Sequence, residues 1–343
     1  MTFNAISYTK DKNGENQWSK GLICLNSISN DSIKFKKILL DDSIKSIIIM
    51  SHNSPDDDAI GSMKTLEDFL INNKKNVELL FQTKVDRKYE VILGKNRVEK
   101  ISYPKKSYYD LAIILDTSDI CMTYYDLYNI ASKIVVVDHH KTTNIKYDYY
   151  FNYNDCSTGL TLLKLLGDHN ITSDMATYIG LTIISDTDSF KNKNVTSESF
   201  SALSKLMDLG CDIELVNSLY NKMTMTYINL LSLVLKKIVR NNDILYLIIT
   251  EDDINKSNSN IKECGKIINI LKLIEGIDLS ILFIENGNNV IVRFRSNNVN
   301  CSKIAQQYGG GGHKHSAATI IFNRDIYDIK DEILNTLSNK DLF

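Results

Sequence analysis

The chain has 343 residues, and its content of 43% hydrophobic and 24% charged residues is typical of globular proteins. This length favours two domains over one. The formal net charge of −2 argues against a surface for long nucleic acid, so a polyanionic ligand would have to be held at a local site. We find no signal-peptide pattern and no uncharged apolar run of about 18 residues, so we expect a cytoplasmic protein without a membrane segment. The six cysteines are far apart and form no CxxC pair, which favours free thiols in a reducing compartment.

The first half of the chain predicts a parallel α/β sheet. Residues 1–40 are polar and weakly patterned, so we predict a variable N-terminal extension there. From 41 to 212, short β-branched runs alternate with amphipathic stretches, as in folds with a parallel sheet. The predicted strands are 46–51, 76–82, 111–115 and 134–137, and the predicted helices are about 59–73, 158–167 and 197–209.

The second half predicts a smaller α/β domain. The polar stretch at 213–225 is the predicted linker, and the second domain covers 226–343. Its predicted strands are 244–249, 279–284 and 290–294, and a glycine run at 309–312 precedes a final strand and helix.

Histidines and carboxylates gather at the ends of apolar runs in the first domain. Five of the six histidines occur in three short clusters. The first cluster places His52 after a predicted strand, followed by Asp56 and Asp58 in the next loop. Asp56 and Asp58 are two residues apart, so in an extended turn they could serve two neighbouring cations. The alternative is an acidic loop that caps a helix N-terminus.

Three further apolar runs end in potential metal ligands. Asp116 follows 111–115, the sequence Asp138-His139-His140 follows 134–137, and Asp186 follows another apolar run. One of the two adjacent histidines could ligate a metal while the other faces substrate, and Asp138 is placed to orient an imidazole. Asp116 could instead cap the next helix.

Four apolar runs with such ends predict a metal site at the carboxyl edge of the sheet. The ligand set contains carboxylates and imidazoles without thiolates, which suits Mn²⁺, Mg²⁺ or Co²⁺ better than Cu(I) or a structural zinc. Several carboxylates in one place would repel one another unless cations neutralised them, which favours two ions. A pair of ions is the arrangement typical of phosphoryl hydrolysis.

The order and spacing of these motifs resemble the DHH family of phosphoesterases. The four motifs read HNSPDDDAIGS, LDTSD, VVVDHH and SDT, and the segment from Phe294 to Ala318 resembles the glycine-rich motif of the DHH-associated C-terminal domain. The turns Asp155–Gly159 and Val195–Glu198 also fit the family. The resemblance spans roughly residues 45–325. It implies a catalytic domain at 41–212 and a substrate-binding domain at 226–343.

The resemblance also implies the role of each residue. The metal ligands would be His52, Asp56, Asp58, Asp116, His139 and Asp186. Asp116 would bridge two ions, for which Mn²⁺ is the expected metal and Mg²⁺ or Co²⁺ the alternatives. The catalytic set would be His140, Asp116 and Asp138, with His140 at the scissile phosphate. The substrate-binding set would be Arg295, Ser296, Gly310, Gly311, Gly312 and His313. Glycine amides and an arginine are suitable donors to phosphate.

Three residues depart from the family pattern. Asp57 and Asp188 stand where relatives often have Gly, and Ala318 stands where many have Gly. Asp57 flanks the predicted ligands and need not be one of them. Asp188 adds negative charge near the site. These departures bear on substrate preference and leave the predicted ligand set complete.

A stand-alone chain of two domains resembles the nanoRNase-type members of the family. It is therefore expected to hydrolyse short oligoribonucleotides, 3′-phosphoadenosine 5′-phosphate, or linear and cyclic di-adenylates through two-metal activation of water. The first alternative is hydrolysis of inorganic pyrophosphate or polyphosphate, although a family pyrophosphatase would lack the GGGH motif. The second is a nucleotide-binding regulator without catalysis. The resemblance also implies a homodimer, with neither a membrane nor long nucleic acid as a partner.

Overall fold

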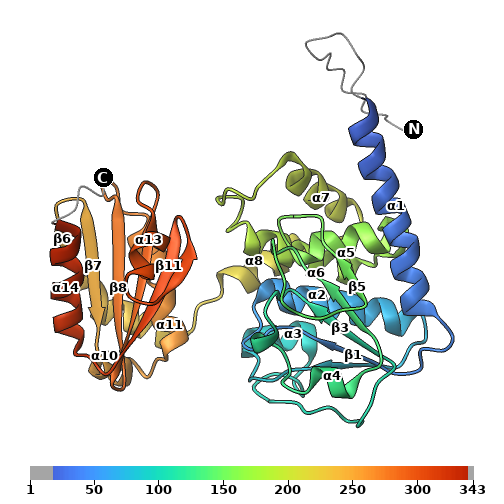
Figure 1. Cartoon of the computed structure of the whole chain (residues 1–343), viewed down its shortest axis with the longest axis horizontal. Coiled ribbons are helices and arrows are strands. Elements are labelled where there is room, and N and C mark those ends of the chain that lie inside the picture. Colours follow the sequence, from blue (N-terminus) through green and yellow to red (C-terminus); the bar gives the residue numbers. More distant parts are fainter. Residues whose placement is uncertain (1–17, 339–343) are drawn as a thin grey trace. The chain divides into compact units, whose positions relative to one another are not determined.

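The computed structural model describes the backbone of residues 18–338 and the side chains of residues 29–337. The chain divides between Lys222 and Met223 into two compact units, which we call the first and the second unit (Figure 1). None of the helices in the described part of the chain combines the length and apolar character that crossing a membrane requires.

The first unit contains a five-stranded parallel sheet with the order β2-β1-β3-β4-β5. Its strands are β1 (Ile47–Met50), β2 (Val77–Leu80), β3 (Leu111–Leu115), β4 (Ile134–Val137) and β5 (Tyr149–Phe151). The three central strands, β1, β3 and β4, are buried along their whole length, because apolar side chains cover both faces of the sheet. This explains their continuous β-branched sequences. The predicted parallel sheet is confirmed.

Helices cover both faces of this sheet. They are α1 (Trp18–Leu40), α2 (Asp57–Asn72), α3 (Glu90–Leu93), α4 (Leu127–Ile130), α5 (Thr158–Leu166), α6 (Ser173–Asp186), α7 (Ser197–Asp208) and α8 (Ile213–Asn221). Ile49 of β1 packs in one core with side chains of α2, α5 and α6, whereas Ile48 packs in the other with α4.

Glycines allow α2, α5 and α6 to approach closely. A Cβ atom at Gly61 of α2 would lie 2.6 Å from the carbonyl oxygen of Tyr178 in α6. A Cβ atom at Gly159 of α5 would lie 2.1 Å from Oγ1 of Thr182, also in α6. This close packing brings the N-termini of α2 and α5 into one region of the unit.

The prediction of a variable extension at 1–40 is wrong for its last part, because α1 belongs to the core. Phe35 and Leu39 are fully buried, and Phe35 makes an edge contact with Phe151 of β5 at 5.1 Å between ring centroids. The hydroxyl of Ser32 donates to the carbonyl of Leu165 at 2.7 Å. Residues 1–17 lie outside the described part of the chain.

The predicted linker at 213–225 is also corrected. Most of it forms α8, and its Val216 and Leu219 are buried in the core of the first unit. The second unit begins with α9 (Met225–Val234), which Thr224 caps. The connection between units is therefore much shorter than predicted.

The second unit contains a six-stranded mixed sheet with the order β10-β11-β9-β8-β7-β6. Only β7 and β8 pair in parallel among these neighbours. The strands are β6 (Val239–Asn241), β7 (Ile244–Ile249), β8 (Leu279–Asn286), β9 (Asn289–Ser296), β10 (Gly311–His313) and β11 (Ser316–Phe322). The remaining helices are α10 (Glu251–Ser257), α11 (Ile261–Lys266), α12 (Ile268–Leu271), α13 (Cys301–Gln306) and α14 (Ile326–Ser338). This confirms a smaller α/β domain.

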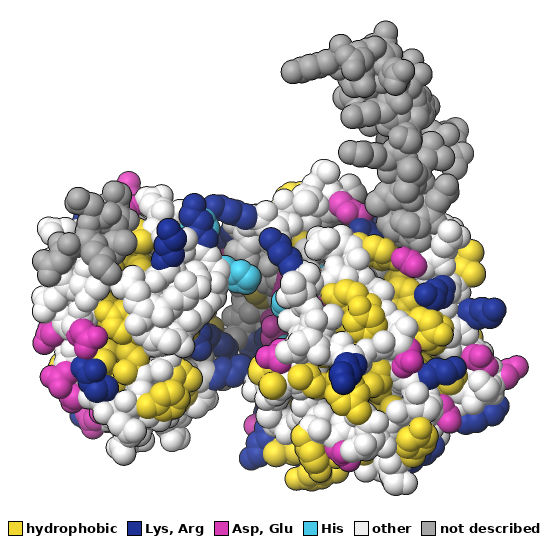
Figure 2. Space-filling view, viewed as in Figure 1, with side chains coloured by type: hydrophobic (Ala, Val, Ile, Leu, Met, Phe, Trp, Pro, Cys, Tyr) yellow, Lys and Arg dark blue, Asp and Glu magenta, His cyan; other side chains and the backbone are white. Residues whose placement is uncertain are grey.

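The surface carries no extended basic stripe on the face shown in Figure 2, where Lys and Arg side chains occur in small groups among neutral and apolar ones. This distribution agrees with the net charge of −2.

Candidate metal centre

The carboxyl ends of three neighbouring strands deliver the central side chains of the site. His52 follows β1, Asp116 follows β3 and His139 follows β4. Because the strands are parallel, these ends meet at one edge of the sheet. The chain leaves β1 toward β2 on one side and returns to β3 on the other, and ligands of open α/β sheets bind at such a switch point. A cavity of about 240 Å³ opens here.

One group of ligand atoms consists of His52, Asp56 and Asp116. Nε2 of His52 lies 3.8 Å from Oδ2 of Asp116 and 4.0 Å from Oδ1 of Asp56. The other ring nitrogen, Nδ1, lies 2.8 Å from the carbonyl of Asn53, so Nε2 is the nitrogen turned toward the carboxylates. Asp56 is the N-cap of α2 and accepts hydrogen bonds from two amides of its first turn. Asp56 therefore caps α2, as the alternative interpretation predicted, and it also belongs to this group of potential metal ligands.

A second group consists of Asp58, His139 and Asp186. Nε2 of His139 lies 3.1 Å from Oδ2 of Asp186 and 3.8 Å from Oδ2 of Asp58. Nδ1 of His139 contacts the carbonyl of Asp155 at 3.3 Å, which again leaves Nε2 for the carboxylates. The three ligand atoms lie within 4.8 Å of one another.

Asp116 belongs to the first group and also contacts His139 of the second. Its Oδ2 faces His52, and its Oδ1 lies 3.5 Å from Nε2 of His139. The hydroxyl of Thr158 donates to Oδ1 at 3.2 Å. The backbone of Asp116 is left-handed, with φ of 54°, a conformation that Asp tolerates better than most residues. A single carboxylate thus stands between two imidazoles.

The N-terminus of α5 holds Asp58 in place. The backbone amide of Thr158 donates to Oδ2 at 2.8 Å, and that of Gly159 donates to Oδ1 at 3.1 Å. The side chain of Asp58 is fully buried, and the positive end of the helix compensates part of its charge. The Ser-Thr-Gly sequence at the start of α5 was recognised as a family turn. The sequence did not indicate that its backbone amides donate hydrogen bonds to Asp58.

Electrostatics in this cluster favour proton retention in the absence of a cation. Burial and the charge of Asp116 raise the pKa of Asp186 to about 8. Burial, with Asp116 and Asp186, raises the pKa of Asp58 well above its usual range. Burial lowers the pKa of His139, but the hydrogen bond with Asp116 and the charges of Asp58 and Asp186 outweigh it and raise the pKa to about 10. Crowded carboxylates of this kind are stabilised by cations.

The donor set fits divalent cations. Four carboxylates and two imidazoles converge, and no thiolate belongs to the groups of ligand atoms found among the described residues. Such donors suit Mn²⁺, Mg²⁺ or Co²⁺. All six predicted ligands are thus brought together. Asp186 reaches the site from the C-terminal end of α6, whereas the sequence suggested a fourth apolar run comparable to the strands.

Asp138 and His140 form a pair beside the ligands. Nδ1 of His140 lies 2.7 Å from Oδ1 of Asp138, which also accepts the backbone amide of His139 at 2.8 Å. Asp138 is fully buried, whereas the side chain of His140 is 47% exposed. The hydrogen bond to Asp138 raises the pKa of His140. Nε2 of His140 is therefore the nitrogen available to a ligand in the cavity.

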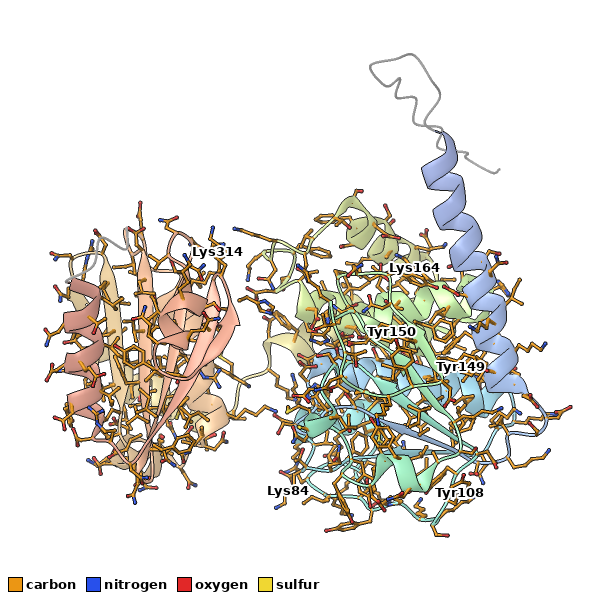
Figure 3. All side chains as sticks on the ribbon, viewed as in Figure 1. Lys84, Tyr108, Tyr149, Tyr150, Lys164 and Lys314 are labelled. Atoms are coloured by element: carbon orange, nitrogen blue, oxygen red, sulfur yellow. The ribbon has the colours of Figure 1, made fainter. Side chains whose placement is uncertain are left out.

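The backbone of His140 is held by strand β5 and the residue that follows it. Nδ2 of Asn152 donates to the carbonyl of His140 at 2.6 Å, and the hydroxyl of Tyr150 donates to the same oxygen at 3.4 Å. Tyr150 is labelled in Figure 3, within the first unit. Neither residue was predicted, because their role depends on the pairing of β5 with β4.

The two acidic departures in this unit face other partners. Asp57 accepts hydrogen bonds from Nζ of Lys88 at 2.6 Å and from the hydroxyl of Tyr89 at 2.8 Å. Asp188 accepts a hydrogen bond from the hydroxyl of Tyr220. Asp57 therefore flanks the ligands without joining either group.

The predicted substrate-binding residues lie on the second unit, around β9, β10 and β11. His313 of β10 pairs with Ser316 of β11, which in turn pairs with Arg295 of β9, so these three side chains form one row across the sheet. His313 is exposed and Arg295 is partly buried. Lys314, labelled in Figure 3, lies in the turn between β10 and β11.

Ser296 and two of the glycines have local structural roles. The hydroxyl of Ser296 is 2.5 Å from the carbonyl of Asp278, to which it donates, and accepts the amide of Val299 at 2.6 Å. Ser296 is only 2% exposed, so its position does not support the predicted contact with substrate. A Cβ atom at Gly310 or Gly312 would collide with backbone atoms of β11, whereas Gly311 has open space around it.

Comparisons with known proteins cover both units. The family model described as "DHH family, N-terminal domain" matches residues 46–184, and the "DHHA1 domain" matches residues 241–339. The bifunctional oligoribonuclease and PAP phosphatase NrnA of Mycoplasma genitalium is 24% identical over 288 residues, which cover 81% of this chain and 89% of that protein.

Solved structures share the fold at lower identity. The exopolyphosphatase-related protein from Bacteroides fragilis has a TM-score of 0.79 at 19% identity, covering 90% of this chain and 96% of that one. RecJ from Thermus thermophilus, in complex with Mn²⁺, has a TM-score of 0.51 at 13% identity, covering 90% of this chain and 55% of that one.

Proposed function

The chain belongs to the DHH family of metal-dependent phosphoesterases, and we propose that its substrates are short oligoribonucleotides or small nucleotides. The small nucleotides include 3′-phosphoadenosine 5′-phosphate and the linear and cyclic di-adenylates. The observation that carries the proposal is the position of Asp116, whose two carboxylate oxygens each face a separate group of imidazole and carboxylate ligands. The Mycoplasma genitalium relative aligns with 81% of this chain. Its name, bifunctional oligoribonuclease and PAP phosphatase, supports this choice of substrates.

Two divalent ions fit the two groups of ligands. His52, Asp56 and Asp116 would hold one ion, and Asp58, Asp116, His139 and Asp186 would hold the other. We expect Mn²⁺, with Mg²⁺ or Co²⁺ as alternatives. When bound, such a pair of ions stabilises negative charge on the phosphoryl oxygens and lowers the pKa of a water molecule.

The remaining side chains position the ligands and move a proton. The α5 amides fix Asp58, and the carbonyl of Asp155 fixes the ring of His139. Asp138 holds Nδ1 of His140, so Nε2 of His140 can donate a proton to the leaving oxygen of the substrate. The exposed part of His140 gives this nitrogen access to the cavity that it lines.

A substrate panel tests the proposal. With Mn²⁺ added, the purified chain should hydrolyse 3′-phosphoadenosine 5′-phosphate, a di-adenylate or a two- to five-nucleotide RNA faster than inorganic pyrophosphate. The reason is that a nucleotide offers a sugar and a base for the second unit to bind, whereas pyrophosphate has neither. Faster turnover of pyrophosphate at equal concentration would identify a pyrophosphatase and contradict the proposal.

Replacing His140 with Gln tests the proton donor. Gln keeps a hydrogen-bonding side chain but cannot supply a proton at neutral pH, so kcat should fall by about 10²–10⁴-fold. Bound metal should stay unchanged, because His140 is not one of the six proposed ligands and its Nδ1 is bonded to Asp138. Steady-state kinetics and metal analysis provide the readouts. His169→Gln is the matched control, since His169 lies in a short 3₁₀ helix apart from the site and should leave kcat unchanged. An unaltered kcat in the His140 variant would exclude the proposed role.

A further inference from the structure

Two arginines lie next to each other on one face of β9. Arg293 and Arg295 are two residues apart in a strand, so their side chains project from the same side of the sheet. Both are partly buried, and the burial lowers the pKa of each guanidinium. Arg295 was predicted as a substrate ligand, whereas Arg293 has no assigned role.

The described part of the chain provides no counter-ion for either arginine. Within residues 29–337, no carboxylate forms an ion pair with either guanidinium. Nη1 of Arg295 donates to the neighbouring carbonyl of Phe294 at 3.0 Å, and Nε of Arg293 is buried without any hydrogen-bond partner. Two partly buried like charges without an anion are costly, and a ligand anion would relieve this cost.

The surroundings of the pair leave room for a ligand. In the register of the sheet, Arg293 pairs with Ala318, and Ala318 pairs with Gly311. Ala318 is exposed, and an added Cβ at Gly311 would meet nothing within 4 Å. On the other side, the guanidinium of Arg293 lies against Gly265 of α11, where a Cβ atom would be only 2.7 Å from Cζ. Gly265 therefore provides the space in which Arg293 is held.

We propose that Arg293 and Arg295 form an anion site that binds a terminal phosphate of the nucleotide substrate. The site rests on the proposed function, since it names the part of the substrate that the second unit recognises. Arg side chains are suited to this ligand because their planar N–H groups match phosphate oxygens. Arg293 then favours substrates that carry one phosphate more than the scissile one.

Binding to the full-length chain tests the site without catalysis. The probes are the dinucleotides ApA, pApA and ApAp, titrated calorimetrically into metal-free protein in EDTA. The wild-type chain should bind one phosphorylated probe about tenfold or more tightly than ApA, the order expected for a charge-assisted hydrogen bond. The preferred probe shows whether a 5′ or a 3′ phosphate is bound.

Substitutions assign the preference to Arg293. Arg293→Gln should reduce the preference for the phosphorylated probe over ApA to about twofold or less. Gly265→Ala should have the same effect, because the added methyl group displaces the guanidinium of Arg293. Arg293→Lys should restore part of the preference. Arg324→Gln is the matched control, because Arg324 is exposed and paired with Glu332 in the same unit. The thermal midpoint of Arg293→Gln should not fall, because the replaced charge has no partner to lose.

Two results would overturn the site. One is an unchanged preference for the phosphorylated probe in Arg293→Gln, and the other is an equal loss of affinity for all three dinucleotides. Failure of the proposed function has a different signature, namely no hydrolysis of any nucleotide by the wild-type chain with Mn²⁺, whatever the binding data show.

Discussion

Replacing Asp116 with Asn should lower kcat/KM for phosphoester hydrolysis by about a thousandfold or more. The substitution removes the one carboxylate that faces both His52 and His139, so both groups of ligands lose affinity for metal. Asn has nearly the shape of Asp and tolerates the left-handed backbone at this position, so the fold should persist. Steady-state kinetics and the amount of Mn²⁺ bound per chain are the measurements.

Asp57→Asn is the matched control for this variant. Asp57 lies between the ligands Asp56 and Asp58, but its side chain is bound by Lys88 and Tyr89 and belongs to neither ligand group. This control should lower the thermal midpoint while leaving bound metal and kcat/KM within a few-fold of the wild type. Wild-type activity and metal content in Asp116→Asn would refute the proposed centre. A wild-type chain that bound nucleotides and hydrolysed none would instead be a nucleotide-binding regulator.

Adding Mn²⁺ to the metal-free protein should raise its thermal midpoint by roughly 5–10 °C at about 100 times the dissociation constant. The cation binds the folded state, where the four carboxylates converge, and has no comparable site in the unfolded chain. Thermal unfolding with and without Mn²⁺, after treatment with EDTA, measures the shift. Asp116→Asn should show little or no shift.

The stabilisation by Mn²⁺ should increase with pH. The pKa of Asp186 is raised from 3.8 to about 8, and that of His139 from 6.5 to about 10, in the metal-free fold. Raised folded-state pKa values mean that the stability of the metal-free protein falls as pH rises through about 8 for Asp186 and about 10 for His139. Mn²⁺ displaces these protons, so its shift of the thermal midpoint should be larger at pH 8.5 than at pH 6.5. An equal shift at both pH values would show that protons and metal do not compete here.

The strand ends were the most predictable part of the site. Strands β3 and β4 occupy the predicted ranges, because a strand buried on both faces has a continuous β-branched sequence. Parallel pairing then places the residues after them at one edge. This is why Asp116 and the pair His139-His140 could be found from the sequence pattern, whereas the choice of His139 as the metal ligand came from the family resemblance.

The helical parts of the first unit were less predictable. Apolar residues of α1 and α8 are interspersed with polar ones at helical spacing, as at Ile213, Val216 and Leu219. The predictions of an extension and a linker missed this pattern, and with it the burial of Phe35 and Val216. Asp186 follows an apolar run that a sheet could also have buried, but the run belongs to α6. Short apolar runs do not distinguish a buried strand from a buried helix.

In the second unit, the family motif identified the region but not the face of each side chain. Arg295 and Ser296 are adjacent in sequence, yet alternation along β9 sends them to opposite sides of the sheet. Arg293 shares the face of Arg295, because both residues lie in β9 and are two positions apart.

The left-handed backbone of Asp116 has a consequence for how variants of this enzyme should be screened. A residue there must adopt φ of 54°, which Asn and Gly do readily while bulky or branched residues do so at a cost. Substitutions that remove metal binding while keeping the fold will therefore show normal expression and a normal melting curve in the absence of metal. A library sorted by solubility alone will retain such variants, and bound metal, activity or the Mn²⁺-dependent thermal shift must be measured to identify them.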